Sequence, residues 1–597
     1  MSLEALEVKD GVKSLNGFTV QTERVDDVPL LIGAMVKIGL HQVIDNHIPW
    51  HWQQRELSWG WTAVIWLAYI MTEGDHRKVS VEEYIKGTKE TLRELTGQKI
   101  EELDFSDDRL TNLLRYLSKK ETWEVIESDL NERTIRVHEL PCNVARCDAT
   151  TVSGYRTEKE GSLFQFGHSK DDPSLPQIKI MMGSLDPLGM PLATDVLSGE
   201  RADDGLYVPV IKRIHDSLKK AGVLYVGDCK MSAFEIRLSL KALENHYLSP
   251  LALTGKTAED MDKWIEEGVS KDKRGELVEV SVKNDRDEDV RIAKGYEFDR
   301  ELSGVNGEEK IEWIERVLVV KSLSHSKQQE KGLEKRLESA QKKIEALTPE
   351  RGRGKRQIAE EEVLKEKIDG IVKKHNVEDL LEIEYKKEVE RKEKFVGKGR
   401  GSKERQKEVI ERVRYEVTQV NRNEEKIEEE KEKFGWKAYV TDVSGRNLSL
   451  SDAVKCYRQQ YGIERIFNRL KSRLDIAPLF VTRNDQIVGL TNLLTLGVRI
   501  YTLIEFVVRR SLQKDNAKLG GLHPENKRKE TDKPTTERLL KAFSGITLTL
   551  IKADGETIRH VTPLSELQKE ILKRLGLDLS LYLNLEINKS ENLLTER

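Results

Sequence analysis

Three acidic residues have the side chains and the positions to bind divalent metal ions. Asp148 ends the short β-like run "NVARCDAT", and Asp228 ends the buried run "VLYVGD". Glu464 lies in the helical stretch "YRQQYGIERIFNRLK". Carboxylate oxygens are ligands that Mg²⁺ prefers, and two ions about 3.5–4 Å apart can activate an attacking oxygen and stabilise a leaving one. The three acids therefore predict a two-metal site for phosphodiester cleavage or strand transfer.

Other acids compete for the same role. An aspartate at a strand end usually serves the following turn, so each acid alone is weak evidence. Asp186, Asp195 and Asp442 also lie near predicted strand ends and are rival ligands. Asp442 is the strongest rival, because its strand is predicted to lie in the same sheet.

The surroundings of Glu464 distinguish it from these rivals. From Lys455 to Arg473 the chain has six Lys or Arg residues and one acid. Steps of three and four residues place five side chains on one helical face: Tyr457, Gln460, Glu464, Asn468 and Lys471. Charge this one-sided suits a polyanion. We therefore expect the bases to hold phosphates and Glu464 to hold a metal.

A sheet and a helix must position these acids. Residues 141–245 have the pattern β-β-β-α-β-α, and residues 436–500 add a strand and a helix. Joined across the residues between them, these elements follow the order of a ribonuclease-H-like fold, in which the first and fourth strands are neighbours. We therefore predict an α/β chain with a ribonuclease-H-like catalytic core that is interrupted by a large insertion.

The pattern divides the chain into five regions. The insertion contains an a/d seam typical of a short coiled coil or helical hairpin, formed by Leu333, Leu337, Ala340, Ile344 and Leu347. The expected regions are a helical N-terminal domain (1–140) for DNA-end binding or dimerisation, the first part of the core (141–245), an insertion domain (246–435) that is β-rich over 246–320 and made of charged helices over 321–434, the second part of the core (436–511) and a C-terminal region (512–597).

Composition excludes several classes of protein. The net charge is −4, so only a local basic patch can indicate a nucleic-acid partner. Four cysteines without a CxxC pair make zinc ribbons and disulfide frameworks unlikely candidates, and they fit a reducing, cytoplasmic location. The apolar run 59–71 is too short to span a bilayer, and the run 489–508 contains Arg499 and Glu505, so we expect no membrane partner.

At the helix that carries Glu464, the sequence resembles bacterial insertion-sequence transposases of the DDE class. The resemblance is to a cut-and-paste group with the signature Tyr-x2-Arg-x3-Glu-x6-Lys, which Tyr457, Glu464 and Lys471 match. Gln460 occupies the Arg position, and Arg458 or Arg465 is the candidate to supply that charge. Upstream, "CDATT" and "YVGDCKMSA" resemble the strands that carry the family's first and second Asp.

The resemblance implies a metal-dependent DNA transposase. It implies Asp148, Asp228 and Glu464 as catalytic residues that bind two Mg²⁺ ions, with Mn²⁺ as a substitute. It further implies terminal inverted repeats and target DNA as partners, a homodimer on paired ends, a hairpin intermediate and a bacterial cytoplasmic location at the nucleoid.

The resemblance also implies DNA contacts from the signature. Tyr457 and Lys471 would contact DNA near the cleaved end, and Trp313 is a candidate to stack on a flipped base, with a core position as the alternative. Two other interpretations stay open, namely a ribonuclease-H-like nuclease without an element to move and a non-catalytic DNA-binding scaffold.

Overall fold

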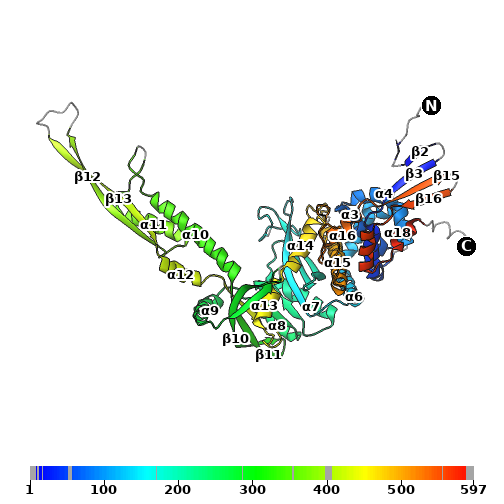
Figure 1. Cartoon of the computed structure of the whole chain (residues 1–597), viewed down its shortest axis with the longest axis horizontal. Helices are drawn as coiled ribbons and strands as arrows, with labels where there is room; N and C mark the ends of the chain where they lie inside the picture. Colours follow the sequence, from blue (N-terminus) through cyan, green and yellow to red (C-terminus); the bar gives the residue numbers. More distant parts are fainter. Residues whose placement is uncertain are drawn as a thin grey trace. The chain divides into compact units, whose positions relative to one another are not determined.

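The computed structural model divides the chain into two compact units. Unit 1 comprises Met1–Ser249, Ser303–Glu312 and Tyr457–Arg597, and unit 2 comprises Pro250–Leu302 and Trp313–Cys456. The structure describes residues 8–9, 12–15, 18–50, 57–169, 171–284, 287–352, 355–396, 406–526, 528–553 and 556–586. Figure 1 labels the elements of both units.

Five strands of unit 1 form part of a nine-stranded sheet and follow the order β6-β5-β4-β7-β8 in it. These strands are β4 (Val144–Ser153), β5 (Gln177–Leu185), β6 (Met190–Ser198), β7 (Leu224–Val226) and β8 (His246–Pro250). β4, β5 and β6 pair antiparallel, whereas β4–β7 and β7–β8 are parallel pairs. The predicted pairing of the first and fourth strands is therefore confirmed, and the fold is mixed α/β with a mixed sheet.

One strand joins the sheet beside those that were expected. The sequence pattern placed 436–441 in the core sheet, and β14 (Trp436–Thr441) lies in the same nine-stranded sheet as β4 and β7, where it also pairs antiparallel with β11 (Glu309–Ser322). The strand that the pattern did not predict is β8, which pairs with β7. The reason is connectivity, because parallel strands need a crossover, usually a helix. α8 (Phe234–Ala242) supplies that crossover directly after β7.

Helices surround the sheet and form the rest of unit 1. α15 (Asn484–Lys514) packs against α1, α3, α5, α14, α16, α17 and β6. The other helices are α1 (Val28–Lys37), α2 (Leu40–His47), α3 (Trp59–Glu73), α4 (Val81–Thr96), α5 (Asp107–Leu117), α6 (Lys120–His138), α7 (Tyr207–Leu218), α14 (Tyr461–Ser472), α16 (Thr536–Lys541), α17 (Glu566–Leu575) and α18 (Ser580–Leu583). Short 3-10 helices lie at Lys78–Ser80, Glu102–Phe105, Asp204–Leu206, Cys229–Ser232 and Asn584–Glu586.

α15 is the buried helix at the centre of this unit. By length and composition it could cross a membrane, and α1 with α2, bent by 58°, passes the same test together. However, 94% of the most apolar window of α15 is buried inside the protein, as a core helix requires. The Ser58 hydroxyl caps α3 by accepting a hydrogen bond from the Trp61 amide at 3.3 Å.

The two ends of the chain share a second sheet, with the order β1-β2-β3-β15-β16. Its strands are β1 (Val8–Lys9), β2 (Val12–Leu15), β3 (Phe18–Arg24), β15 (Thr547–Ala553) and β16 (Glu556–Val561). β3 pairs antiparallel with β15. The expectation of a purely helical region over 1–140 is therefore corrected, because periodicity within a window does not reveal a strand whose partner lies more than 500 residues away.

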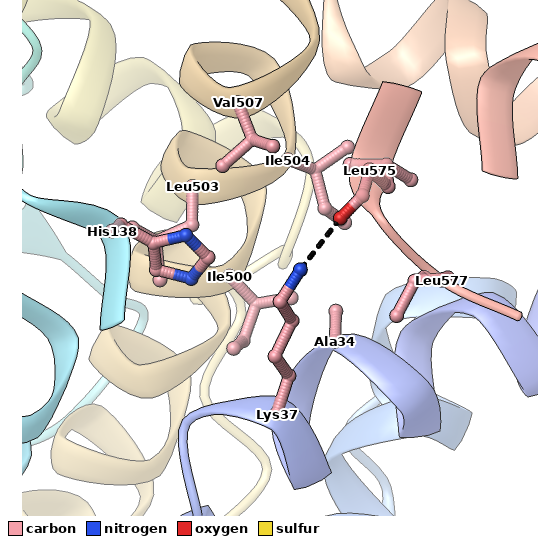
Figure 2. Close-up of a pocket in the computed structure, with 9 residues that line it drawn as sticks. All are labelled: Ala34, Lys37, His138, Ile500, Leu503, Ile504, Val507, Leu575 and Leu577. Atoms are coloured by element: carbon pink, nitrogen blue, oxygen red, sulfur yellow. Dashed lines mark hydrogen bonds between the residues drawn. The ribbon is translucent and has the colours of Figure 1, made fainter. Parts of the chain in front are cut away.

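α1 and α17 are also joined beside α15. Figure 2 shows the Lys37 ammonium donating to the Leu575 carbonyl, at 2.8 Å, where α17 ends. A cation at a helix C-terminus satisfies orphan carbonyls and opposes the negative end of the helix dipole. His138 lines the same small pocket, and its burial, together with the charges of Lys37 and Arg510, lowers its pKa to about 4.

Unit 2 contains most of the remaining strands of the nine-stranded sheet, in the order β14-β11-β10-β9, and a separate helical part. β9 is Val278–Lys283, β10 is Asp289–Asn306, and the helices are α9 (Lys256–Lys273), α10 (Leu323–Glu345), α11 (Glu361–His375), α12 (Glu424–Glu432) and α13 (Leu450–Arg458). Four residues of the predicted a/d seam are at most 1% exposed: Leu333, Leu337, Ala340 and Ile344. α10 packs against α11, so the helical hairpin is confirmed there.

In the second half of 321–434 the structure has two strands where the sequence predicted charged helices. β12 (Leu381–Phe395) and β13 (Lys407–Arg422) form a long antiparallel hairpin beside α10 and α11 (Figure 1). Opposite charges pair across the strands, as in Arg391–Glu411 at 2.7 Å and Arg414–Glu388 at 2.7 Å. Cross-strand pairs of this kind stabilise two neighbouring strands, so charge content alone did not distinguish strand from helix.

Candidate active site

The first two acids lie at the same end of adjacent strands. The last parallel pair of β4 and β7 is Arg146 opposite Val226, and two residues further along are Asp148 and Asp228. The backbone stays close over this extension, because a Cβ atom on Gly227 would lie 3.3 Å from the Cys147 carbonyl oxygen. The strand register therefore places Asp148 and Asp228 at the same end of two adjacent parallel strands.

Specific hydrogen bonds hold each carboxylate. The Asp148 Oδ1 accepts from the Ala149 amide at 2.8 Å. The Asp228 Oδ1 accepts from the Lys230 amide at 2.9 Å and from the Tyr207 hydroxyl at 2.7 Å. Burial, followed by the charges of Asp228 and Asp148, holds the pKa of Tyr207 well above its ordinary value. Tyr207 therefore stays a neutral hydrogen-bond donor that faces both acids.

Glu464 lies on a helix that packs against the same sheet. α14 contacts β4, and Gly462 fits against the turn after β5, where a Cβ atom on Gly189 would lie 2.9 Å from the Gly462 carbonyl oxygen. The Glu464 side chain is exposed. Within the described residues it has no ion-pair partner, although bases flank it in the sequence.

The structure does not assemble all three acids into one ligand set. Across the described part of the chain, no three His, Cys, Asp or Glu side chains are close enough to hold one metal ion. The pair of Asp148 and Asp228 fits the oxygen chemistry of Mg²⁺, which proteins often bind through one or two carboxylates together with substrate phosphates and water. The Asp pair is therefore the part of the predicted site that this structure brings together.

A buried ion pair anchors the segment that leads to Glu464. Arg146, two residues before Asp148 on β4, bonds Asp186 through Nη2 at 2.9 Å and Nε at 3.3 Å. Its Nη1 also donates to the Tyr457 carbonyl at 3.4 Å. Arg146 is 1% exposed and Asp186 4%. This network fixes the end of α13 to the strand that carries the first acid.

The same contact corrects the expectation of one continuous helix over the signature. α13 ends at Arg458 and α14 begins at Tyr461. An uninterrupted helix needs the Tyr457 carbonyl to accept from residue 461, and the Arg146 guanidinium binds that carbonyl instead. Gln460 lies in the break and donates to the Tyr457 hydroxyl at 3.1 Å. Tyr457 and Arg458 are both half-buried.

Three of the six bases around Glu464 are bound by acids from elsewhere in unit 1. Arg465 forms a two-pronged ion pair with Glu505, and Arg469 bonds Glu505 at 2.6 Å. Lys471 bonds both oxygens of Asp171, at 2.8 and 2.9 Å. The expectation that the bases of this helix lie free for phosphates is corrected here, because these partners are far from the helix in sequence.

Two rival ligands are bound as structural partners. Asp186 belongs to the buried pair with Arg146, and Asp195 is paired with Arg213. Asp442 belongs to unit 2, whereas Asp148, Asp228 and Glu464 all belong to unit 1.

Trp313 lies in β11, within the sheet of unit 2. Its indole is 8% exposed, which is typical of a packing residue. Its stacking on a flipped base stays a prediction.

Sequence reasoning missed the residues that support the acids. The signal for Arg146 was an arginine in an otherwise apolar strand, two residues before the first acid. The signal for Tyr207 was weaker, because a tyrosine that opens an amphipathic helix is ordinarily a core residue. Both act through contacts between distant segments, which the local pattern does not contain.

Two of the three comparisons with known proteins give matches. Residues 20–128 match a family model described as "Domain of unknown function (DUF4277)". The search of curated proteins found no match. Among solved structures, a piggyBac transposase synaptic complex with hairpin DNA, determined by cryo-EM, matches with a TM-score of 0.30 and 8% identity, over 95% of this chain and 87% of that one. Similarity at this level carries no argument about function.

Proposed function

We propose that this protein is a DNA transposase of the DDE class that cuts and joins the ends of an insertion sequence. The observation that carries the proposal is the placement of Asp148 and Asp228 opposite each other at the ends of the parallel strands β4 and β7. The strand order β6-β5-β4-β7-β8 agrees with a ribonuclease-H-like core. The signature residues Tyr457, Glu464 and Lys471 lie where α13 and α14 meet this unit.

Asp148 and Asp228 would hold divalent metal, Mg²⁺ or Mn²⁺, with Glu464 as the proposed third ligand. Such ions, when bound, supply charge stabilisation and an activated oxygen for in-line displacement at phosphorus. The chain's own residues orient the acids: Tyr207 and the Lys230 amide fix Asp228, and the Ala149 amide fixes Asp148. The Arg146–Asp186 pair holds the segment that enters α14.

The finer steps rest on the resemblance of the signature. They are cut-and-paste movement through a hairpin intermediate, recognition of terminal inverted repeats, and a homodimer on paired ends. Arg458 and Gln460 are proposed as DNA contacts beside Tyr457, because all three lie at the junction that Arg146 anchors.

Cleavage of the element's own ends tests this proposal. Duplexes that carry the sequences flanking the gene are incubated with wild type, Asp228→Asn or Glu464→Gln, in Mg²⁺ or in EDTA. The matched control is Glu132→Gln, which removes a similar charge from the surface of α6, where Glu132 and Lys219 form an exposed pair. We expect metal-dependent cutting at the ends by wild type and the control only. Equal cutting by Glu464→Gln would remove Glu464 from the site.

One observation favours a second candidate, a DNA-binding scaffold without catalysis. The described residues contain no three-acid metal cluster, so Glu464 is not held beside the Asp pair. Under this alternative, wild type and all three variants bind the ends and none cuts them, in either Mg²⁺ or Mn²⁺.

A further inference from the structure

A pocket of about 280 Å³ opens where α14 meets α15 and the turn after β5. We call it the Glu505 pocket and define it by six of its lining residues, namely Tyr461, Arg465, Glu505, Phe506, Arg509 and Arg510. Arg465 follows Glu464 directly in the first turns of α14. The pocket therefore contains the residue that follows the proposed third ligand on this helix, although no step of the proposed chemistry uses it.

One buried carboxylate in this pocket serves three guanidinium groups. Glu505 is 5% exposed. It pairs with Arg465, with Arg469 at 2.6 Å and with Arg509 at 2.9 Å. A single negative charge does not neutralise three positive ones, and Glu537 offsets only Arg469, at 3.1 Å. Arg510 lies 5.0 Å over the Phe506 ring. The cluster therefore contains four arginines and two glutamates.

The excess positive charge of the cluster affects the pKa of Arg509. Burial lowers the pKa of Arg509, and Arg465 and Arg469 lower it further, against the opposing effect of Glu505. Repulsion among these guanidinium groups would be relieved by a second anion. A ligand that brings a negative charge therefore gains more here than at an ordinary surface arginine.

The arginines keep donors for such a ligand. Each guanidinium has five N–H groups in a planar fork that matches carboxylate and phosphate oxygens. Arg465 directs its two Nη atoms to Glu505, and its side chain is 29% exposed. Arg509 pairs with Glu505 through Nη1, donates to the Pro534 carbonyl through Nε and, at 3.4 Å, to the Lys533 carbonyl through Nη2, and is 31% exposed. Tyr461, 58% exposed, gives the mouth of the pocket an aromatic face suited to a sugar or base.

We propose that the Glu505 pocket binds a backbone phosphate of DNA next to the one that is cleaved. This inference rests on the proposed function, because a strand that crosses the acid pair beneath α14 would carry neighbouring phosphates along the same helix. Glu505 is then the internal anion that keeps the arginines aligned while DNA is absent. The pocket explains why α15, a buried helix, presents arginines at 509 and 510 beside α14.

The test is the salt dependence of DNA binding, measured in EDTA on a generic duplex so that no cleavage is required. Each phosphate contact contributes about −0.9 to the slope of log K against log salt. We expect Arg465→Gln to reduce the magnitude of the slope by about 0.9. Arg469 and Arg509 still hold Glu505 in this variant, so the fold is retained. Arg465→Lys, which keeps the charge, should restore the slope.

The matched control is Arg133→Gln, whose side chain is 25% exposed and pairs with one acid, Asp129. The proposal is overturned if Arg465→Gln keeps the wild-type slope, if Arg133→Gln lowers the slope equally, or if wild type binds no DNA. Specific cutting of the element's ends together with an unchanged Arg465→Gln slope would reject the pocket and retain the transposase. A reduced slope for Arg465→Gln without any cutting by wild type would reject the transposase and retain the pocket as a phosphate site.

Discussion

Breaking the Arg146–Asp186 pair should destabilise β4 and β5 strongly and locally. Asp186→Asn removes the carboxylate charge that pairs with the Arg146 guanidinium, which is only 1% exposed in the sheet that carries Asp148. Removing one partner of a buried pair costs about 3–5 kcal/mol, because the remaining charge is not solvated. Since about 1.4 kcal/mol corresponds to a factor of ten, amides of both strands that exchange through this opening should exchange at least about 100-fold faster.

The assay is hydrogen exchange by mass spectrometry on peptides from β4 and β5, with Glu132→Gln as the control. A double variant, Arg146→Met with Asp186→Leu, separates stability from positioning, because apolar residues of similar volume often replace a buried pair at little cost. We expect slow exchange to return while cleavage stays impaired, since the Tyr457 carbonyl has lost its donor. Unchanged exchange in Asp186→Asn, or full cleavage by the double variant, would refute this reasoning.

Four further predictions follow from the structure. In the absence of DNA, Asp228→Asn should abolish Mn²⁺ binding measured by electron paramagnetic resonance, whereas Glu464→Gln should leave it unchanged, because Glu464 is outside any three-donor cluster of the described residues. Tyr207→Phe removes a hydrogen bond to a carboxylate, worth about 1.5–3 kcal/mol, so single-turnover cleavage should slow by about 10- to 100-fold. Because the folded chain lowers the pKa of His138 from 6.5 to about 4, stability is fully present above pH 6.5 and is lost as the pH falls through this window, so wild type should lose about 2 kcal/mol relative to His138→Gln between pH 7 and 5 in denaturant titrations. Leu337→Ala should destabilise the α10–α11 hairpin by about 2–5 kcal/mol, seen as faster exchange in α10 and α11 without a change in β4.

The sequence predicted those features that depend on local pattern and on general rules of sheet topology. Asp148 and Asp228 each end a short apolar run, and the rule that the first and fourth strands are neighbours brought them together. The a/d seam from Leu333 to Ile344 was readable because α10 buries one face along its own length. In each case the decisive information lies within about 20 residues of chain.

The errors share a physical cause, which is competition between local pattern and distant partners. "HYLSP" is too short and polar to stand out as a strand, yet it completes the parallel sheet as β8. The stretch over β12 is rich in Lys and Glu, and only its pairing with β13 makes it a strand. The helix over the signature is interrupted after Arg458. There the Tyr457 carbonyl accepts a hydrogen bond from Arg146, which is 311 residues away in the sequence.

Charge at the signature helix shows the same effect most clearly. Counted along the chain, six bases surround Glu464, which suggests a helix covered with phosphate ligands. Counted in space, Asp171 neutralises Lys471, and Glu505 draws Arg465 and Arg469 toward α15. The guanidinium groups of Arg465 and Arg469 therefore lie beside Glu505 rather than beside Glu464. Around Glu505 the positive charges outnumber the negative ones. If Glu464 binds metal as proposed, this arrangement helps it, because Arg465 is paired with Glu505 and does not compete with the ion for the Glu464 oxygens.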